Sequence, residues 1–110
     1  MKPFDIFSWE PPGWREPHPA VVISHPDRAA NKEMVEVLMC SSHRASRPNY
    51  SNEIILDKAD GLDWPTICKC DLIYAVPRGD LKHRRGQISD ARRAPLLRAL
   101  IAAHGWAQAL

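Results

Sequence analysis

The chain has 110 residues, of which 45% are hydrophobic and 25% are charged, and its formal net charge is +2 at pH 7. This length suits one domain with one core, spanning residues 1–110, and the balance excludes a disordered or fibrous chain. The small positive excess permits an anionic partner without requiring one. It is concentrated in the last third of the chain, and such a basic block is usually a solvated face and less often an RNA or partner surface.

Apolar and β-branched runs predict five strands, at residues 4–9, 20–24, 33–40, 53–56 and 66–76. A loop marked by Pro11, Pro12 and Gly13 follows the first strand, and a polar loop at residues 41–52 precedes the fourth. Pro77 ends the fifth strand, because proline cannot continue the hydrogen-bonded ladder of a central strand.

The end of the chain combines a basic segment with a helical pattern. Residues 78–86 are expected to form a basic loop, and residues 87–89 could add a sixth short strand. A helix is expected to begin after a cap at Ser89 or Asp90, or alternatively at residues 94–95. Its apolar face and its C-terminal stop are formed by Leu96, Leu97, Leu100, Ile101, His104 and Gly105. These elements predict a mainly β fold, a small and strongly bent antiparallel barrel with the helix packed on it.

The three cysteines, Cys40, Cys68 and Cys70, cannot all pair with one another. No apolar run approaches the roughly 20 residues needed to cross a bilayer, and the first residues lack the pattern of a secretory signal. We therefore expect a reduced, soluble, cytoplasmic protein. With His43 the cysteines could form a structural zinc site, but the single residue between Cys68 and Cys70 is poor spacing for zinc. We favour small thiols that face the core.

The fifth predicted strand carries the strongest sign of chemistry. Side chains alternate along a strand, so Lys69 and Asp71 should project to one side. The other side should carry Cys68, Cys70, Leu72, Tyr74 and Val76. A lysine and an aspartate held together on a strand can stabilise a phosphate and move a proton, which suggests a nuclease site. An ordinary exposed ion pair is the alternative that this segment alone leaves open.

Four segments together resemble the MazF/PemK/Kid toxins of bacterial toxin–antitoxin systems. Residues 12–24 are similar to the first loop and second strand of that family, and residues 37–42 to its apolar strand that runs into threonine or serine. Residues 67–71 resemble a family strand with cysteine and aspartate in succession. Residues 81–89, followed by the helix, match in order and spacing. The resemblance covers nearly the whole chain, and its strength lies in the order of the segments.

The resemblance implies a homodimeric, SH3-like barrel that cleaves single-stranded RNA without a metal or other cofactor. In that chemistry the ribose 2′-hydroxyl attacks the adjacent phosphodiester and leaves a 2′,3′-cyclic phosphate and a 5′-hydroxyl. The reaction needs a group that accepts the 2′ proton, a group that protonates the leaving oxygen, and cations that stabilise the phosphorane. The resemblance also implies an acidic antitoxin protein as partner.

The resemblance further suggests roles for individual residues. Lys69, helped by Arg15, would stabilise the negative charge, and Asp71 would accept a proton or orient the cation. Ser41, or failing that Ser42, would donate a hydrogen bond to a phosphate oxygen.

RNA contacts are expected around this centre. Trp14 could stack on a base, and Arg44 and Arg47 could follow the RNA backbone, although a solvated loop is an equal alternative for the two arginines. We expect packing against the barrel or a subunit interface for Trp9, Trp64 and Trp106.

One position departs from the family. This chain has His18 where the family usually has an arginine just before the proline that ends the loop. Histidine could act as general acid or base, since its ordinary pKa is near 6.5. Alternatively, loss of the guanidinium leaves a barrel that binds RNA or a partner without cleaving. With the zinc protein, these form three candidate functions, of which we favour the ribonuclease toxin.

Overall fold

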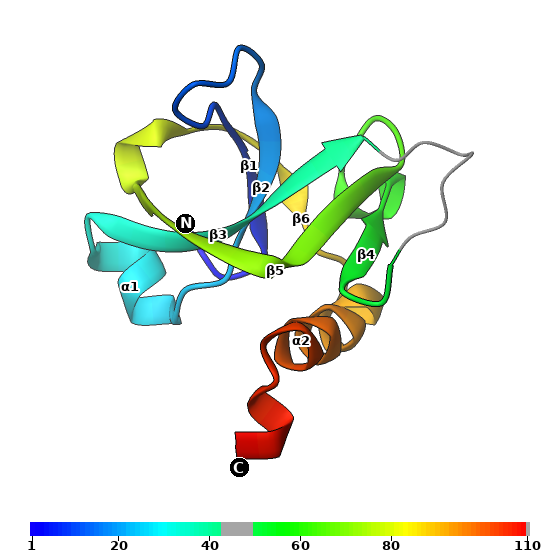
Figure 1. Cartoon of the computed structure of the whole chain (residues 1–110). Helices are drawn as coiled ribbons and strands as arrows, with labels where there is room; N and C mark the ends of the chain where they lie inside the picture. Colours follow the sequence, from blue (N-terminus) through cyan, green and yellow to red (C-terminus); the bar gives the residue numbers. More distant parts are fainter. Residues whose placement is uncertain (43–49, 110) are drawn as a thin grey trace.

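The computed structural model describes residues 1–42 and 50–109, and Figure 1 shows their arrangement. The strands are β1 (Asp5–Trp9), β2 (His18–Val22), β3 (Met34–Ser42), β4 (Glu53–Leu56), β5 (Thr66–Pro77) and β6 (Leu81–Gln87). The α-helices are α1 (Pro26–Asn31) and α2 (Asp90–His104), and three short 3₁₀ helices are η1 (Lys58–Asp60), η2 (Arg78–Asp80) and η3 (Trp106–Ala109).

The strands form one antiparallel sheet in the order β4-β5-β3-β2-β1-β6. This mainly β architecture with a C-terminal helix confirms the predicted fold class. The five predicted strands are all present, with ends shifted by up to two residues. In Figure 1 the sheet curls, and α2 packs against β5 and β4. Among the described helices, none is long and apolar enough to span a membrane.

Alternating side chains of the curled sheet fill two apolar clusters. One cluster lies under α2 and is made largely of Ile6, Val21, Leu38, Leu56, Ile88, Leu96 and Leu100. The other lies on the opposite face and is made largely of Trp9, Ala20, Val22, Val35, Val37 and Val76. Neighbouring residues of β2 therefore enter different clusters, as the period of two in a strand requires. Gly105, with φ of 67°, ends α2 as predicted.

The local structure differs from the sequence predictions in two places. Residues 78–86, predicted as a basic loop, form η2 and most of β6. The register of β6 against β1 shifts twice, and His83 has φ of 45°, so bulges hide the strand period. Helix α1 was not predicted, because its six residues are too few to show helical periodicity. It begins at Pro26, and the ring of His25 accepts a hydrogen bond from the Asp27 N–H at 3.1 Å.

An ion-pair cluster fastens α2 to the connection between β4 and β5. The Arg92 guanidinium donates to both carboxylate oxygens of Asp57, at 2.7 and 2.9 Å, and also to buried Asp60. These hydrogen bonds lower the pKa of Asp57 to about 2 and raise the pKa of Arg92. Asp60 also accepts a hydrogen bond from the Ser89 N–H at 2.8 Å, so the start of α2 is fixed to η1.

Two glycines let η1 and β6 approach closely. A Cβ on Gly86 would lie 2.0 Å from the carbonyl oxygen of Asp60, and a Cβ on Gly61 would lie 2.8 Å from the carbonyl oxygen of Arg85. Gly61 also has φ of 90°, in the left-handed region that favours glycine. This close approach sets the position of Arg85 and of the segment that leads to Trp64.

Candidate active site

A large bulge in β5 brings Lys69 and Asp71 to the surface. Leu38 pairs with Ile73, but Cys40 pairs with Cys68, so Met39 alone faces residues 69–72 of β5. The bulged segment is also held on its other side, where the Cys70 N–H donates to the Asn52 carbonyl at 2.9 Å. Bulges of this kind redirect side chains and often lie beside functional sites.

The bulge changes the predicted alternation. Cys68 and Cys70 are buried, as predicted, but Leu72 is 53% exposed, and both Leu72 and Tyr74 line the same pocket as Lys69 and Asp71. The prediction that these two residues lie on the opposite side is therefore wrong, because it assumed an unbroken strand.

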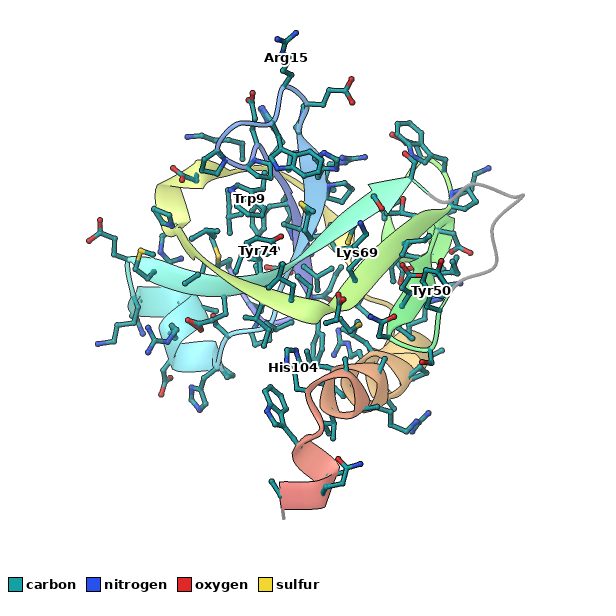
Figure 2. All side chains as sticks on the ribbon, viewed as in Figure 1. Trp9, Arg15, Tyr50, Lys69, Tyr74 and His104 are labelled. Atoms are coloured by element: carbon teal, nitrogen blue, oxygen red, sulfur yellow. The ribbon has the colours of Figure 1, made fainter. Side chains whose placement is uncertain are left out.

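We call this depression the Lys69 pocket. It encloses about 290 Å³ and is lined by Trp14, Met39, Lys69, Asp71, Leu72 and Tyr74. Among the described residues, the side chains of Lys69 and Asp71 form no hydrogen bond or ion pair, with each other or with any other group. Both side chains are therefore available to a ligand, and Figure 2 shows Lys69 on the face that β3 and β5 share.

A second depression, the His18 pocket, lies beside the start of β2. It encloses about 130 Å³, and its lining includes His18, Ser41, Ser42, Trp64, Thr66 and Arg85. The His18 Nδ1–H donates to the Cys40 carbonyl at 3.1 Å, because a carbonyl oxygen can only accept. In a neutral imidazole this hydrogen bond selects the tautomer with the proton on Nδ1 and leaves Nε2 with a lone pair, as a general base requires.

Trp14 joins the two pockets. Its ring lines the Lys69 pocket and meets the His18 ring edge-on, with 5.0 Å between ring centroids and an interplanar angle of 88°. The structure therefore places the predicted groups Lys69 and Asp71 together, and His18 with Ser41 in the adjoining pocket.

Other predicted site residues are placed elsewhere. Arg15 lies at the tip of the exposed β1–β2 loop, points away from the sheet in Figure 2, and lines neither pocket. Arg44 and Arg47 fall outside the described residues.

Sequence reasoning missed Arg85 as a site residue. Its guanidinium makes no hydrogen bond or ion pair with a described residue, and it lines the His18 pocket. In the sequence, Arg85 stands out only as part of a basic segment. Because residues 78–86 were predicted to form a loop, the direction of its side chain could not be predicted. Trp64, predicted to pack, is 53% exposed and lines the same pocket.

The cysteines form a core cluster behind the bulge. All three are buried, which confirms the prediction that they face the core. A hydrogen bond with Cys40 raises the pKa of Cys68, and a hydrogen bond with Cys68 raises the pKa of Cys70. The described part of the chain holds no group of three or more metal-binding side chains placed to bind an ion, and His43, the fourth ligand of the zinc alternative, lies outside it.

Comparison with known proteins identifies the family. A family model described as PemK-like, MazF-like toxin of type II toxin–antitoxin systems matches residues 4–104. The chain belongs to this toxin family. The family resemblance seen in the sequence is thereby confirmed, and the match includes both pockets. No curated protein matches the chain closely enough to count as a relative.

Solved structures share the fold of this toxin-family chain at low sequence identity. A structure of an endoribonuclease in complex with its cognate antitoxin, from Mycobacterial species, is 15% identical, with a TM-score of 0.82 over 96% of this chain and 95% of that chain. The Mycobacterium tuberculosis toxin MazF-mt6 is 18% identical, with a TM-score of 0.78 over 92% and 96%. MazE–MazF from Deinococcus radiodurans is 13% identical, with a TM-score of 0.74 over 96% and 95%.

Proposed function

We propose that this protein is a toxin that cleaves single-stranded mRNA without a metal, by attack of the ribose 2′-hydroxyl. The observation that carries the proposal is the pair Lys69 and Asp71, both without a described partner, in a pocket joined through Trp14 to the His18 ring. Membership of the toxin family supports the class of activity.

The two pockets supply the groups that the reaction needs. His18 Nε2 accepts the 2′ proton as O2′ bonds to phosphorus, and the bond from phosphorus to O5′ breaks. The Lys69 ammonium stabilises the phosphorane and donates a proton to O5′, and the Asp71 carboxylate in the same pocket orients the ammonium once RNA is bound. Arg85 supplies a guanidinium within the His18 pocket, close to where the family usually has arginine. Ser41, or Ser42 beside it, donates a hydrogen bond to a phosphate oxygen.

RNA contacts extend beyond the reacting phosphate. Trp14, 51% exposed, offers a ring on which a base can stack. Arg15 lines neither pocket and points away from the sheet in Figure 2, so we assign it to the RNA backbone, with Arg44 and Arg47 in the same role. Binding through such phosphate contacts should weaken as salt increases.

The test is cleavage of a short single-stranded RNA by purified protein in EDTA. We expect a 2′,3′-cyclic phosphate and a 5′-hydroxyl, and no cleavage when the scissile ribose carries 2′-hydrogen. Lys69→Ala and Asp71→Asn should lower the cleavage rate by about 100-fold or more, whereas Lys32→Ala, which removes an exposed lysine outside both pockets, should not. Cleavage of the 2′-deoxy substrate, or full activity of Lys69→Ala, would refute the mechanism.

We propose an acidic antitoxin and a second copy of this chain as protein partners. Two of the solved structures with this fold are described as an endoribonuclease in complex with its cognate antitoxin and as a MazE–MazF pair. An antitoxin segment rich in aspartate and glutamate could cover Lys69 and Arg85 and block RNA. Sedimentation of the purified chain, alone and with the product of the neighbouring gene, tests both partners.

RNA binding without cleavage is the second candidate function. His18 in place of the usual arginine favours it, because a neutral imidazole does not hold phosphate as a guanidinium does. In the same EDTA assay, retention of RNA without new 5′-hydroxyl ends would support this candidate over the first.

A further inference from the structure

A third depression, the Trp9 pocket, adjoins the Lys69 pocket and has no role in the proposed cleavage. It encloses about 290 Å³, and its lining includes Trp9, Trp14, Tyr74, Pro77 and Asp80. Small-molecule sites enclose roughly 300–1000 Å³, so this volume suits one nucleobase better than a larger ligand. Trp14 and Tyr74 line both pockets. A ligand that fills one pocket can therefore extend into the other.

One wall of the Trp9 pocket is a packed pair of aromatic rings. Trp9 is 3% exposed, and its ring meets the Tyr74 ring at 61° with 5.1 Å between centroids. Figure 2 shows Trp9 and Tyr74 close together, beside Lys69. A rigid aromatic wall next to a phosphate-binding lysine is the arrangement on which single-stranded RNA stacks an unpaired base.

Two residues that line this pocket carry polar groups without a partner in the described chain. The buried indole N–H of Trp9 has no acceptor there, and buried donors are rarely left so. The exposed carboxylate of Asp80 has no hydrogen bond or ion pair there either, although Lys82 and His83 line the cleft on its other side. The pocket therefore offers a carboxylate that can only accept hydrogen bonds.

The chemistry of the bases selects among them. A carboxylate binds best where two neighbouring donors face it, and guanine presents N1–H beside its N2 amino group. Adenine and cytosine place a ring acceptor beside their amino group, and uracil places its N3–H between two carbonyls, so each sets an acceptor against the carboxylate.

We propose that the Trp9 pocket receives a guanine base of the bound RNA, stacked on Trp14 and Tyr74 with its Watson–Crick edge at Asp80. This inference rests on the proposed function, since it names the base that accompanies the phosphate in the adjoining Lys69 pocket. It makes Asp80 a specificity-determining residue that takes no part in the proton transfers.

The experiment measures binding of oligonucleotides that cannot be cleaved. Fluorescence anisotropy follows four 2′-O-methyl pentanucleotides, UUGUU, UUAUU, UUCUU and UUUUU, with the whole chain. We expect UUGUU to bind about tenfold or more tightly than the others, as one bidentate base contact allows. Asp80→Asn should remove that preference, and Asp27→Asn, which changes an 88% exposed carboxylate on α1, should retain it.

The outcomes separate this inference from the proposed function. Equal binding of the four oligonucleotides, no binding, or an unchanged preference in Asp80→Asn overturns the guanine assignment. Tyr74→Leu should weaken UUGUU most, and an unchanged affinity would overturn the stacking. RNA cleavage without guanine preference would support the nuclease proposal and refute the guanine proposal. Guanine preference in a protein that never cleaves RNA would end only the nuclease proposal.

Discussion

Adding a single methyl group at Gly86 should strongly destabilise the fold. A Cβ there would lie 2.0 Å from the Asp60 carbonyl oxygen, 3.0 Å from the Asp60 carbonyl carbon and 3.0 Å from the Gly61 Cα. All three are backbone atoms, so no flexible side chain can move aside. In Gly86→Ala the β6 and η1 backbones must separate by more than an ångström.

The cost follows from what that separation disturbs. Overpacking alone costs about 1–3 kcal/mol. Moving Asp60 also strains its hydrogen bonds from the Ser89 N–H and Arg92, and hydrogen bonds to charged groups contribute about 1.5–3 kcal/mol each. We expect Gly86→Ala to lower the free energy of unfolding by roughly 3 kcal/mol or more, which lowers Tm by about 12 °C or more in a chain of this size.

Urea denaturation and thermal melts of Gly86→Ala and Gly79→Ala provide the measurement. A Cβ on Gly79 would meet no heavy atom of the described residues within 4 Å, so this substitution should change the free energy of unfolding by about 1 kcal/mol at most. RNA cleavage should also fall in Gly86→Ala, because Arg85 precedes the displaced residue. A Gly86→Ala protein as stable as Gly79→Ala would refute the close packing of η1 on β6.

Three further predictions concern acid stability, the thiols and His18. The hydrogen bonds from Arg92 lower the pKa of Asp57 from 3.8 to about 2, so this carboxylate stabilises the fold above about pH 4, and the contribution is lost as pH falls towards 2. Urea midpoints between pH 2 and 7 should show that loss in the wild type and less of it in Asp57→Asn. Iodoacetamide at pH 8 should leave the three buried thiols unmodified in the native protein and label them after unfolding, as mass spectrometry would report. His18→Ala should lower the cleavage rate by about 10²–10⁴-fold, measured at saturating RNA, if Nε2 is the general base.

The regular parts of the fold could be predicted from the sequence. Runs such as residues 53–56 carry enough β-branched residues to mark a strand, and Gly105 marks the end of α2. The polar strand β6 could not be predicted, because its bulges and the positive φ of His83 break the period of two. Helix α1 is too short for a helical period to emerge.

The site could be predicted only in part. The placement of Lys69 and Asp71 in one pocket follows from their spacing, but the exposure of Leu72 depends on a bulge that no local pattern reveals. Arg85 enters the His18 pocket only because β6 packs on η1 through Gly86, a contact between segments far apart in the chain. Long-range contacts of this kind have no signature in a single sequence.

Single-turnover cleavage by Lys69→Ala, His18→Ala and the double variant tests most directly whether the two pockets act on one phosphodiester. The substrate is an oligodeoxynucleotide with one ribonucleotide, so that one bond can react. We expect each single substitution to lower the rate by about 100-fold or more, and the double variant to lose less than the product of the two, as for groups that stabilise one transition state. Wild-type rates in either single variant would contradict the account.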